Sequence, residues 1–189
     1  MRPSTEEKRQ RFRELHRQGC FVIPNPWDIG SAMALQSLGF QALASTSSGM
    51  AWSLGRPDNG VELERVLAHL ENVVKAVDLP VNADFEGGFA VSPEGVAANV
   101  ARAIETGVAG LSIEDSTGDS EAPLYDFELA VERVAAARAA IDAAGGEVLL
   151  TARSEGFFIG RPDLEETVRR LQVCAEAGAD CLYAPGIRS

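Results

Sequence analysis

Short apolar runs alternate along the chain with longer segments in which apolar residues recur at helical spacing. The short runs predict strands at residues 20–23, 42–45, 81–84, 111–113, 148–152 and 181–184. The longer segments predict helices at 4–18, 28–38, 61–76, 92–107, 126–144 and 163–177. The predicted strands are continuously apolar, which is typical of parallel strands covered on both faces.

Residues typical of helix ends support these boundaries. Ser4 and Glu7 have the spacing of a capping box. Ser92-Pro93-Glu94 combines a cap, a proline in the first turn and an acid, which indicates a helix start. Gly39 stands where a helix would end before the second predicted strand.

A weak internal repeat favours a barrel over an open sheet. Gly39–Leu43 resembles Gly107–Leu111 and Gly178–Leu182, at offsets of 68 and 71 residues. Each offset holds two βα units of about 35 residues, a size that suits a (β/α)8 barrel of the triosephosphate isomerase type. A doubly wound sheet is the alternative, but it usually has a glycine-rich turn after strand one, where this chain has Pro24–Trp27.

The predicted number of units is too small for a closed barrel. Six βα units can be recognised over residues 1–189, with the helix at 1–18 before strand one, whereas closure needs eight. We therefore expect a single α/β barrel domain that is truncated after about six units, with its C-terminal part missing. Unpaired strand edges invite association, so we also expect a homo-oligomer or a partner that completes the barrel.

Charge and composition narrow the possible partners. The formal net charge of −11 argues against nucleic acid and against anionic membranes. No run of 18 apolar residues predicts a membrane span, and the charged start MRPSTEEKRQ does not resemble a secretion signal. Cys20, Cys174 and Cys181 are odd in number and lack CxxC spacing, so we expect buried thiols in a reducing cytoplasm.

Polar residues at the predicted strand ends are the candidates for chemistry, because barrel active sites lie there. Asp84 and Glu86 follow strand three, Glu114 follows strand four and Arg153 follows strand five. Converging carboxylates repel one another unless a cation lies among them, and ligation by oxygen alone favours Mg²⁺ or Mn²⁺. Arg153 could bind a substrate carboxylate, and the 45–47 segment offers donors to a second anionic group.

Each of these residues, taken by itself, could instead have only a structural role. An acid at a strand end is often a helix cap or a solvated loop residue, and we expect Asp115 to be a cap or a supporting acid. Glu155 could pair with an arginine. His16 and His69 lie on predicted helices, where we expect them to be solvated.

Several motifs occur in the order seen in one enzyme superfamily. They are Pro24-Asn25-Pro26-Trp27-Asp28, Ser45-Thr46-Ser47-Ser48-Gly49, Leu54-Gly55-Arg56-Pro57-Asp58, Ala83-Asp84-Phe85-Glu86-Gly87-Gly88, Ile113-Glu114-Asp115 and Thr151-Ala152-Arg153. From about Phe21 onward the chain resembles the isocitrate lyase/phosphoenolpyruvate mutase superfamily. Its members bind 2-oxo acids, or their enol or phosphono analogues, on Mg²⁺ and make or break an adjacent C–C or P–C bond.

The resemblance assigns roles to individual residues. It implies that Ser45, Thr46 and Ser47 bind a substrate carboxylate and that Arg153 also binds substrate. It implies that Asp58, Asp84 and Glu114 belong to the metal cluster, some of them through water. We therefore expect Asp58 and Arg153 to serve catalysis, and Asp84, Glu86 and Glu114 to bind Mg²⁺ or Mn²⁺.

Departures from the superfamily pattern narrow the expected reaction. Asn82 replaces an acid usual in the family, so the metal could bind more weakly or shift toward Glu86. The segment Asp115–Tyr125 contains no Cys, His or Lys, which argues against isocitrate and methylisocitrate lyase activity and against phosphoryl migration. What remains is a decarboxylase or carbon–carbon lyase acting on an oxaloacetate-like acid, or a related hydrolase.

Two other functions stay open. Asn82 and the short chain are compatible with a catalytically idle binding or assembly protein on the same fold. A phosphosugar-type barrel is the third possibility, but its phosphate site usually follows strands seven and eight, which this chain does not contain.

Overall fold

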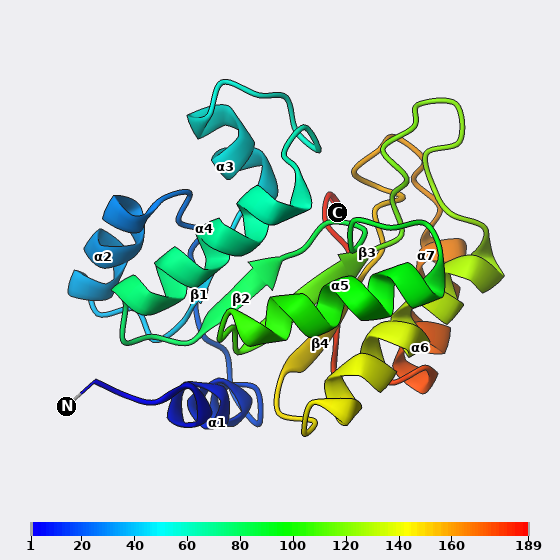
Figure 1. Cartoon of the computed structure of the whole chain (residues 1–189). Coiled ribbons are helices and arrows are strands. Elements are labelled where there is room, and N and C mark those ends of the chain that lie inside the picture. Colours follow the sequence, from blue (N-terminus) through cyan, green and yellow to red (C-terminus); the bar gives the residue numbers. More distant parts are fainter. Residues whose placement is uncertain (1, 189) are drawn as a thin grey trace. The chain divides into compact units, whose positions relative to one another are not determined.

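The computed structural model describes residues 2–188 and contains both helices and parallel strands (Figure 1). Its helices are α1 (Thr5–Leu15), α2 (Ile29–Ser37), α3 (Ser47–Ser53), α4 (Leu63–Ala76), α5 (Pro93–Glu105), α6 (Phe127–Ala143) and α7 (Leu164–Glu176). Its strands are β1 (Leu43–Ala44), β2 (Val81–Asp84), β3 (Gly110–Glu114), β4 (Leu149–Arg153) and β5 (Cys181–Tyr183).

The strands form one sheet in which each strand is hydrogen-bonded to the next along the chain, in the order β1-β2-β3-β4-β5. The β1–β2 pair is parallel, with Leu43 opposite Val81. The β4–β5 pair is also parallel, with Arg153 opposite Tyr183. Parallel strands in chain order with helical connections confirm the α/β class and match the topology of part of a (β/α) barrel.

The chain divides into two compact units. The first contains the chain up to Asp84 together with Arg102–Leu111 and Gly146–Val148. The second contains Phe85–Ala101, Ser112–Gly145 and the chain from Leu149 onward.

Helix α4 supplies much of the core of the first unit. One face of this helix is apolar and buried, and α4 packs against α2 and β2. Lys8 of α1 is also buried, and its ammonium group donates to the carbonyl oxygens of Val74 and Val77 (2.9 and 2.7 Å). The apolar core of this unit includes Phe12, Leu43, Leu70, Val73, Val77, Val81 and Val108.

Helices α6 and α7 cover the strands of the second unit. They pack against each other and against β4, and α7 also contacts β5. The buried side chains here include Phe85, Val96, Ile113, Val134, Ile141, Leu150 and Ala152.

The repeat detected in the sequence has a physical cause. Gly39, Gly107 and Gly178 all have left-handed backbone angles, with φ of 88°, 88° and 106°. Each amide donates to a carbonyl three residues earlier, at 3.0–3.1 Å. The repeat therefore marks three helix ends, because glycine adopts the left-handed conformation there at little cost.

The prediction of a strand at 20–23 was wrong, and residues 2–188 contain five strands instead of six. One hydrogen bond does join this part of the chain to the sheet, from the Ala44 amide to the Pro24 carbonyl (3.0 Å). Pro24 and Pro26 lack the N–H groups that a longer ladder requires.

Helix α3 was not predicted, because its sequence SSGMAWS is typical of a polar loop. Thr46 caps this helix, and its hydroxyl accepts from the Gly49 amide (3.1 Å). A local cap thus outweighs the weak helix propensity of serine and glycine.

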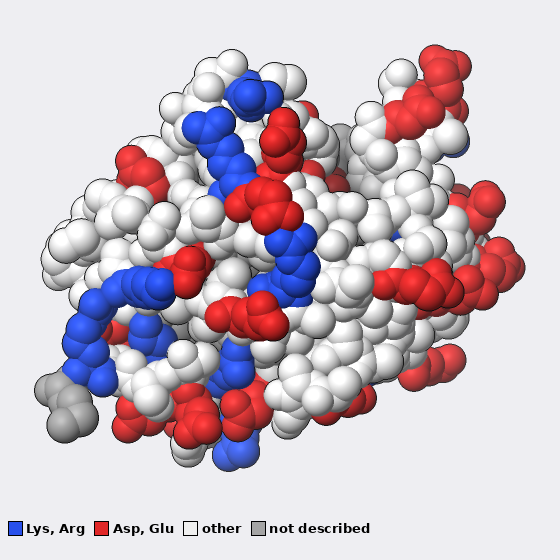
Figure 2. Space-filling model, viewed as in Figure 1, with Lys and Arg blue, Asp and Glu red and all other residues white. Residues whose placement is uncertain are grey.

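Charged side chains of both signs are interleaved on the face seen in Figure 2. Exposed ion pairs include Lys75 with Glu71 (2.6 Å) and Arg102 with Glu64 (2.7 Å). Within residues 2–188, no helix combines the length and the apolar character needed to cross a membrane.

Candidate functional site

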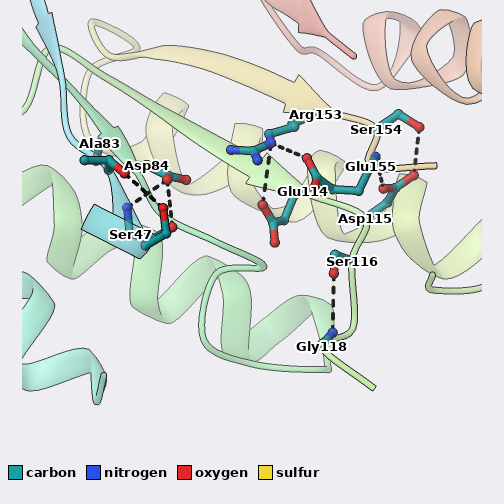
Figure 3. Close-up of polar contacts among 12 residues, drawn as sticks. Ser47, Ala83, Asp84, Glu114, Asp115, Ser116, Gly118, Arg153, Ser154 and Glu155 are labelled. Carbon is teal, nitrogen blue, oxygen red and sulfur yellow. Dashed lines mark hydrogen bonds and ion pairs between the residues drawn. The ribbon is translucent and has the colours of Figure 1, made fainter. Parts of the chain in front are cut away.

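In the first unit, a serine-rich turn surrounds the end of β2. The amide and hydroxyl groups of Ser47 both donate to one carboxylate oxygen of Asp84, at 2.9 and 2.8 Å (Figure 3). The Asp84 amide donates to the hydroxyl of Ser45 (2.9 Å). Helix α3 begins at Ser47, so Thr46, its cap, helps to hold this arrangement. The structure thus brings together four of the predicted site residues.

Asp58 has fewer polar contacts than this group, whereas the Asn82 carbonyl accepts from the Ser45 amide (2.8 Å). Asp58 is exposed and accepts from the amide of Asn59 (3.1 Å). No hydrogen bond found among residues 2–188 joins Asp58 to Ser45, Ser47 or Asp84. Its predicted catalytic role therefore stays a prediction.

In the second unit, Arg153 lies among carboxylates at the end of β4 (Figure 3). Its Nε donates to Glu155 and lies 3.7 Å from a carboxylate oxygen of Glu114. The sequence did not assign this partnership, although it allowed Glu155 to pair with an arginine. The Glu114 amide donates to the Glu86 carbonyl (3.1 Å), which joins the ends of two chain segments that carry candidate ligands.

Asp115 anchors this group, as expected for a supporting acid. It is 8% exposed, and its carboxylate accepts from the Glu155 amide (2.8 Å) and the Ser154 hydroxyl (3.1 Å). Arg170 of α7 lies 3.4 Å from the same carboxylate. Asp115 thereby fixes the backbone that carries Glu155, and Glu155 in turn orients the Arg153 guanidinium.

Sequence reasoning missed Arg170, yet the chain contains a signal for it. Thr167 and Cys174 mark the buried face of α7, and Arg170 lies between them at helical spacing. An arginine on the buried face of an amphipathic helix needs a polar partner. Asp115 is that partner.

The oxygen donors suit a Mg²⁺ ion that keeps several waters better than an ion bound by protein ligands alone. Within residues 2–188, no three His, Cys, Asp or Glu side chains form a group ready to hold a metal ion. Asp84 and Glu114 offer carboxylate oxygens and are partly exposed. Mg²⁺ usually retains several waters and needs only one or two carboxylates besides its substrate. Each of these carboxylates, Asp84 in the first unit and Glu114 in the second, therefore fits this ion through water-mediated contacts.

A separate cleft of about 440 Å³ lies in the first unit. His69 lines it together with Asp28 and Arg65. The expectation that His69 is solvated was wrong, because its Nε2 is buried without a hydrogen-bond partner. Burial lowers the pKa of His69, and the nearby Asp28 opposes this effect.

The three cysteines differ in exposure, so the expectation of three buried thiols was wrong for Cys20 and is confirmed only in part for Cys181. Cys174 is buried and Cys181 is half-buried, but Cys20 is exposed. Burial is the main cause that raises the pKa of Cys174 to about 11, and Asp115 contributes further.

Comparison with known proteins places the chain in a family. A family model described as phosphoenolpyruvate phosphomutase matches residues 12–189. The chain belongs to this family, within the phosphoenolpyruvate mutase/isocitrate lyase superfamily.

Relatives agree with this placement. An uncharacterised protein of Mycobacterium tuberculosis is 32% identical over 92% of this chain and 64% of its own length. An oxaloacetate decarboxylase of Paraburkholderia xenovorans is 29% identical over 97% of this chain and 62% of its own length. The chain thus spans less than two thirds of the length of these relatives.

Solved structures are similar as well. A protein of Burkholderia cenocepacia is 46% identical, with a TM-score of 0.95 over 98% of this chain and 67% of that one. A phosphonopyruvate hydrolase solved with oxalate and Mg²⁺ is 26% identical, with a TM-score of 0.87 over 94% of this chain and 62% of that one. The superfamily includes Mg²⁺-dependent lyases and mutases that act on oxo-acid substrates, and this supports the expectation that the chain belongs to an enzyme.

Proposed function

We propose that this protein is a Mg²⁺-dependent lyase that cleaves a C–C or P–C bond next to the carbonyl of a small 2-oxo or dicarboxylic acid such as oxaloacetate. The observation that carries the proposal is Arg153, a cation held between Glu114 and Glu155 at the end of a parallel strand. Its fixed guanidinium plane suits a substrate carboxylate, and the surrounding acids favour a divalent cation. The related decarboxylase and hydrolase support the same substrate class.

Each candidate residue has a role in this proposal. Arg153 binds and orients one substrate carboxylate, and the donors of Ser45, Thr46 and Ser47 bind another anionic group, with Ser47 exchanging its hydrogen bonds to Asp84 for the substrate. Asp58 assists catalysis. The metal ligands are Asp84, Glu86 and Glu114, some of them through water.

The chemistry that Mg²⁺ supplies when bound is Lewis-acid stabilisation of the negative charge that develops as the bond next to the carbonyl breaks. In the protein without substrate, Asp84 accepts two hydrogen bonds from Ser47, which orient its carboxylate. Glu155 accepts from Arg153 and is itself held by Asp115, which restricts rotation of the Arg153 side chain, so less entropy is lost when substrate binds.

A thermal-shift measurement tests the metal-dependent site. Oxalate with Mg²⁺ should raise the melting temperature, whereas oxalate alone should not. A ligand at 100 times its dissociation constant adds about 2.7 kcal/mol, and each kcal/mol corresponds to about 2–4 °C in a chain of this size. We expect a smaller rise, because Asn82 replaces one acid.

Two variants sharpen this test. Glu114→Gln should abolish the rise, while the matched control Glu128→Gln, on the exposed surface of α6, should retain it. An equal rise with and without Mg²⁺ would show that oxalate does not bind through a metal.

A second candidate is a binding protein without catalytic activity, and Asn82 is the observation that favours it. Solvent-deuterium exchange into pyruvate separates the two possibilities, because only an enzyme that forms an enolate catalyses the exchange. Exchange that depends on Mg²⁺ supports the lyase. Binding of oxalate without any exchange supports the alternative.

A further inference from the structure

Arg133 of α6 is a buried cation in the second unit. Its side chain is 1% exposed, and it lies on the buried face of the helix beside Ala130, Val134 and Ala137. None of the ion pairs found among residues 2–188 involves Arg133. A buried guanidinium without a carboxylate requires other polar contacts to offset its desolvation.

Backbone carbonyls provide those contacts. One terminal nitrogen of Arg133, Nη1, donates to the carbonyls of Ala90 (2.5 Å) and Val91 (2.7 Å). The other, Nη2, donates to the carbonyl of Gly87. All three acceptors belong to the loop Phe85–Val91, which follows β2 and contains the candidate ligand Glu86.

This loop has a conformation that its sequence would not adopt readily by itself. Glu86 and Phe89 have left-handed backbone angles, with φ of 48° and 55°. Such angles are unfavourable for residues with side chains and persist where surrounding contacts fix them. The three hydrogen bonds from Arg133 span the turn and supply that constraint.

Gly87 leaves room for the guanidinium. A Cβ atom added at this position would lie 3.0 Å from Nη2 of Arg133 and 3.4 Å from the Ser116 carbonyl oxygen. Its φ is not in the left-handed region, so close packing, and not backbone strain, explains the need for glycine here.

Tyr125 connects the same cation to a second loop. The Arg133 guanidinium lies 3.9 Å from the centre of the Tyr125 ring, a cation–π contact. The Tyr125 amide donates to the Asp115 carbonyl (2.9 Å) at the end of the segment that follows β3. Arg133 thus contacts the two loops that leave β2 and β3.

We propose that Arg133 is a positioning residue that fixes the loop Phe85–Val91, and through it the candidate metal ligand Glu86, against the segment that ends at Tyr125. The Glu114 amide bonds to the Glu86 carbonyl (3.1 Å), so movement of this loop also affects Glu114. The proposal rests on the proposed function for its effect on metal binding. The proposed effect of Arg133 on the conformation of the loop does not depend on the proposed function.

Hydrogen exchange tests the positioning directly. The Gly88 amide donates to the Phe85 carbonyl (2.9 Å) inside the loop. In Arg133→Ala this amide should exchange about tenfold faster or more, because a hydrogen bond to a charged group contributes enough for that factor. The control Arg138→Ala removes another arginine of α6, one that pairs with Asp142 and Asp180, and should leave Gly88 unchanged.

Metal affinity gives the functional readout. Binding of Mn²⁺ in the presence of oxalate, followed by electron paramagnetic resonance, should weaken about tenfold in Arg133→Ala, since loss of residues that orient ligands costs about 10–100-fold. Added guanidinium ion should restore part of the affinity. A purely structural role would not predict such rescue. Arg133→Lys should give an intermediate affinity.

Gly87→Ala keeps the proposal testable if Arg133→Ala fails to fold. It retains the arginine but crowds Nη2, so it should accelerate Gly88 exchange and weaken Mn²⁺ binding. Unchanged exchange in either folded variant would overturn the positioning role. Wild-type protein that binds no Mn²⁺ with oxalate would overturn the proposed function, and the exchange data would still decide the role of Arg133.

Discussion

At the scale of single residues, replacement of Arg153 is the most direct test of substrate binding. Its guanidinium contacts both Glu155 and Glu114, so a replacement must keep the positive charge to avoid unbalanced carboxylates. Arg153→Lys keeps the charge but loses the planar fork. We expect the variant to fold and to bind oxalate with Mg²⁺ at least about tenfold more weakly, because charged hydrogen bonds contribute roughly 1.5–3 kcal/mol.

Titration calorimetry measures this difference, and circular dichroism checks that the variant is folded. Arg169→Lys is the matched control, because Arg169 is largely exposed on α7. Equal oxalate affinity in Arg153→Lys and wild type would make Arg153 a structural partner of Glu155 instead.

The cysteines provide a test of burial at the same scale. Burial raises the pKa of Cys174 to about 11 from its ordinary 9.0, and it also raises the pKa of Cys181. At pH 8, iodoacetamide should therefore modify the exposed Cys20 first and Cys174 only after unfolding. Mass spectrometry of the peptides gives the order, and Cys20→Ser should remove the fast phase.

The same shift predicts a dependence of stability on pH. The raised pKa means that the folded state keeps the Cys174 proton at a pH where the unfolded chain releases it. The resulting stabilisation is fully present below about pH 9 and is lost as the pH rises through about 11. Urea unfolding from pH 8 to 11 should show a smaller decline in Cys174→Ala than in wild type.

The placement of most candidate site residues at strand ends could be predicted because these residues follow apolar runs. Asp84, Glu114 and Arg153 each end a strand in the structure. Arg133 and Arg170 were missed because they lie on helices far along the chain from the residues that they contact. Their positions on buried helix faces were nevertheless visible in the sequence, so helical phase adds information that strand ends do not contain.

At the scale of elements, the sequence predicted long helices well and short segments poorly. Helices α4, α6 and α7 have long apolar faces or strong caps, and their approximate ranges were confirmed. The strand predicted at 20–23 was wrong, and helix α3 was not predicted. In both, a local feature decided the outcome: proline in the first and a threonine cap in the second.

The segment from Ser116 to Pro123 is the element for which we predict ligand-dependent motion. It is bridged at its base between Ser116 and Leu124, and Thr117 bonds to both Pro123 and Ala122 (3.0 and 2.6 Å). Its tip, from Gly118 to Glu121, is exposed. We expect it to close over bound ligand, because a lid excludes water from an enolate.

Limited proteolysis with a glutamate-specific protease measures this motion through cleavage after Glu121. Oxalate with Mg²⁺ should slow the cleavage, and either one alone should not. Thr117→Val removes the hydroxyl that bonds to Ala122 and should speed cleavage of the unliganded protein. Equal rates with and without the ligands would argue against closure.

At the scale of the whole molecule, strand β5 predicts self-association. It stands at one edge of the sheet and is paired with β4. Leu182 and Tyr183 on this strand are 46% and 50% exposed. A strand edge with exposed apolar side chains is a surface on which another chain can pair, so we expect the chain of residues 1–189, tested by itself, to self-associate through β5.

Leu182→Lys tests this prediction, because lysine on an edge strand opposes pairing. Burying a leucine contributes about 1.5–3 kcal/mol, so its loss should weaken association about tenfold or more. Sedimentation velocity over a concentration series measures the change. Val168→Lys, at a similarly exposed position on α7, is the control and should associate like wild type. A wild-type monomer at every concentration would contradict pairing through β5, and equal weakening in both variants would assign association to general surface hydrophobicity.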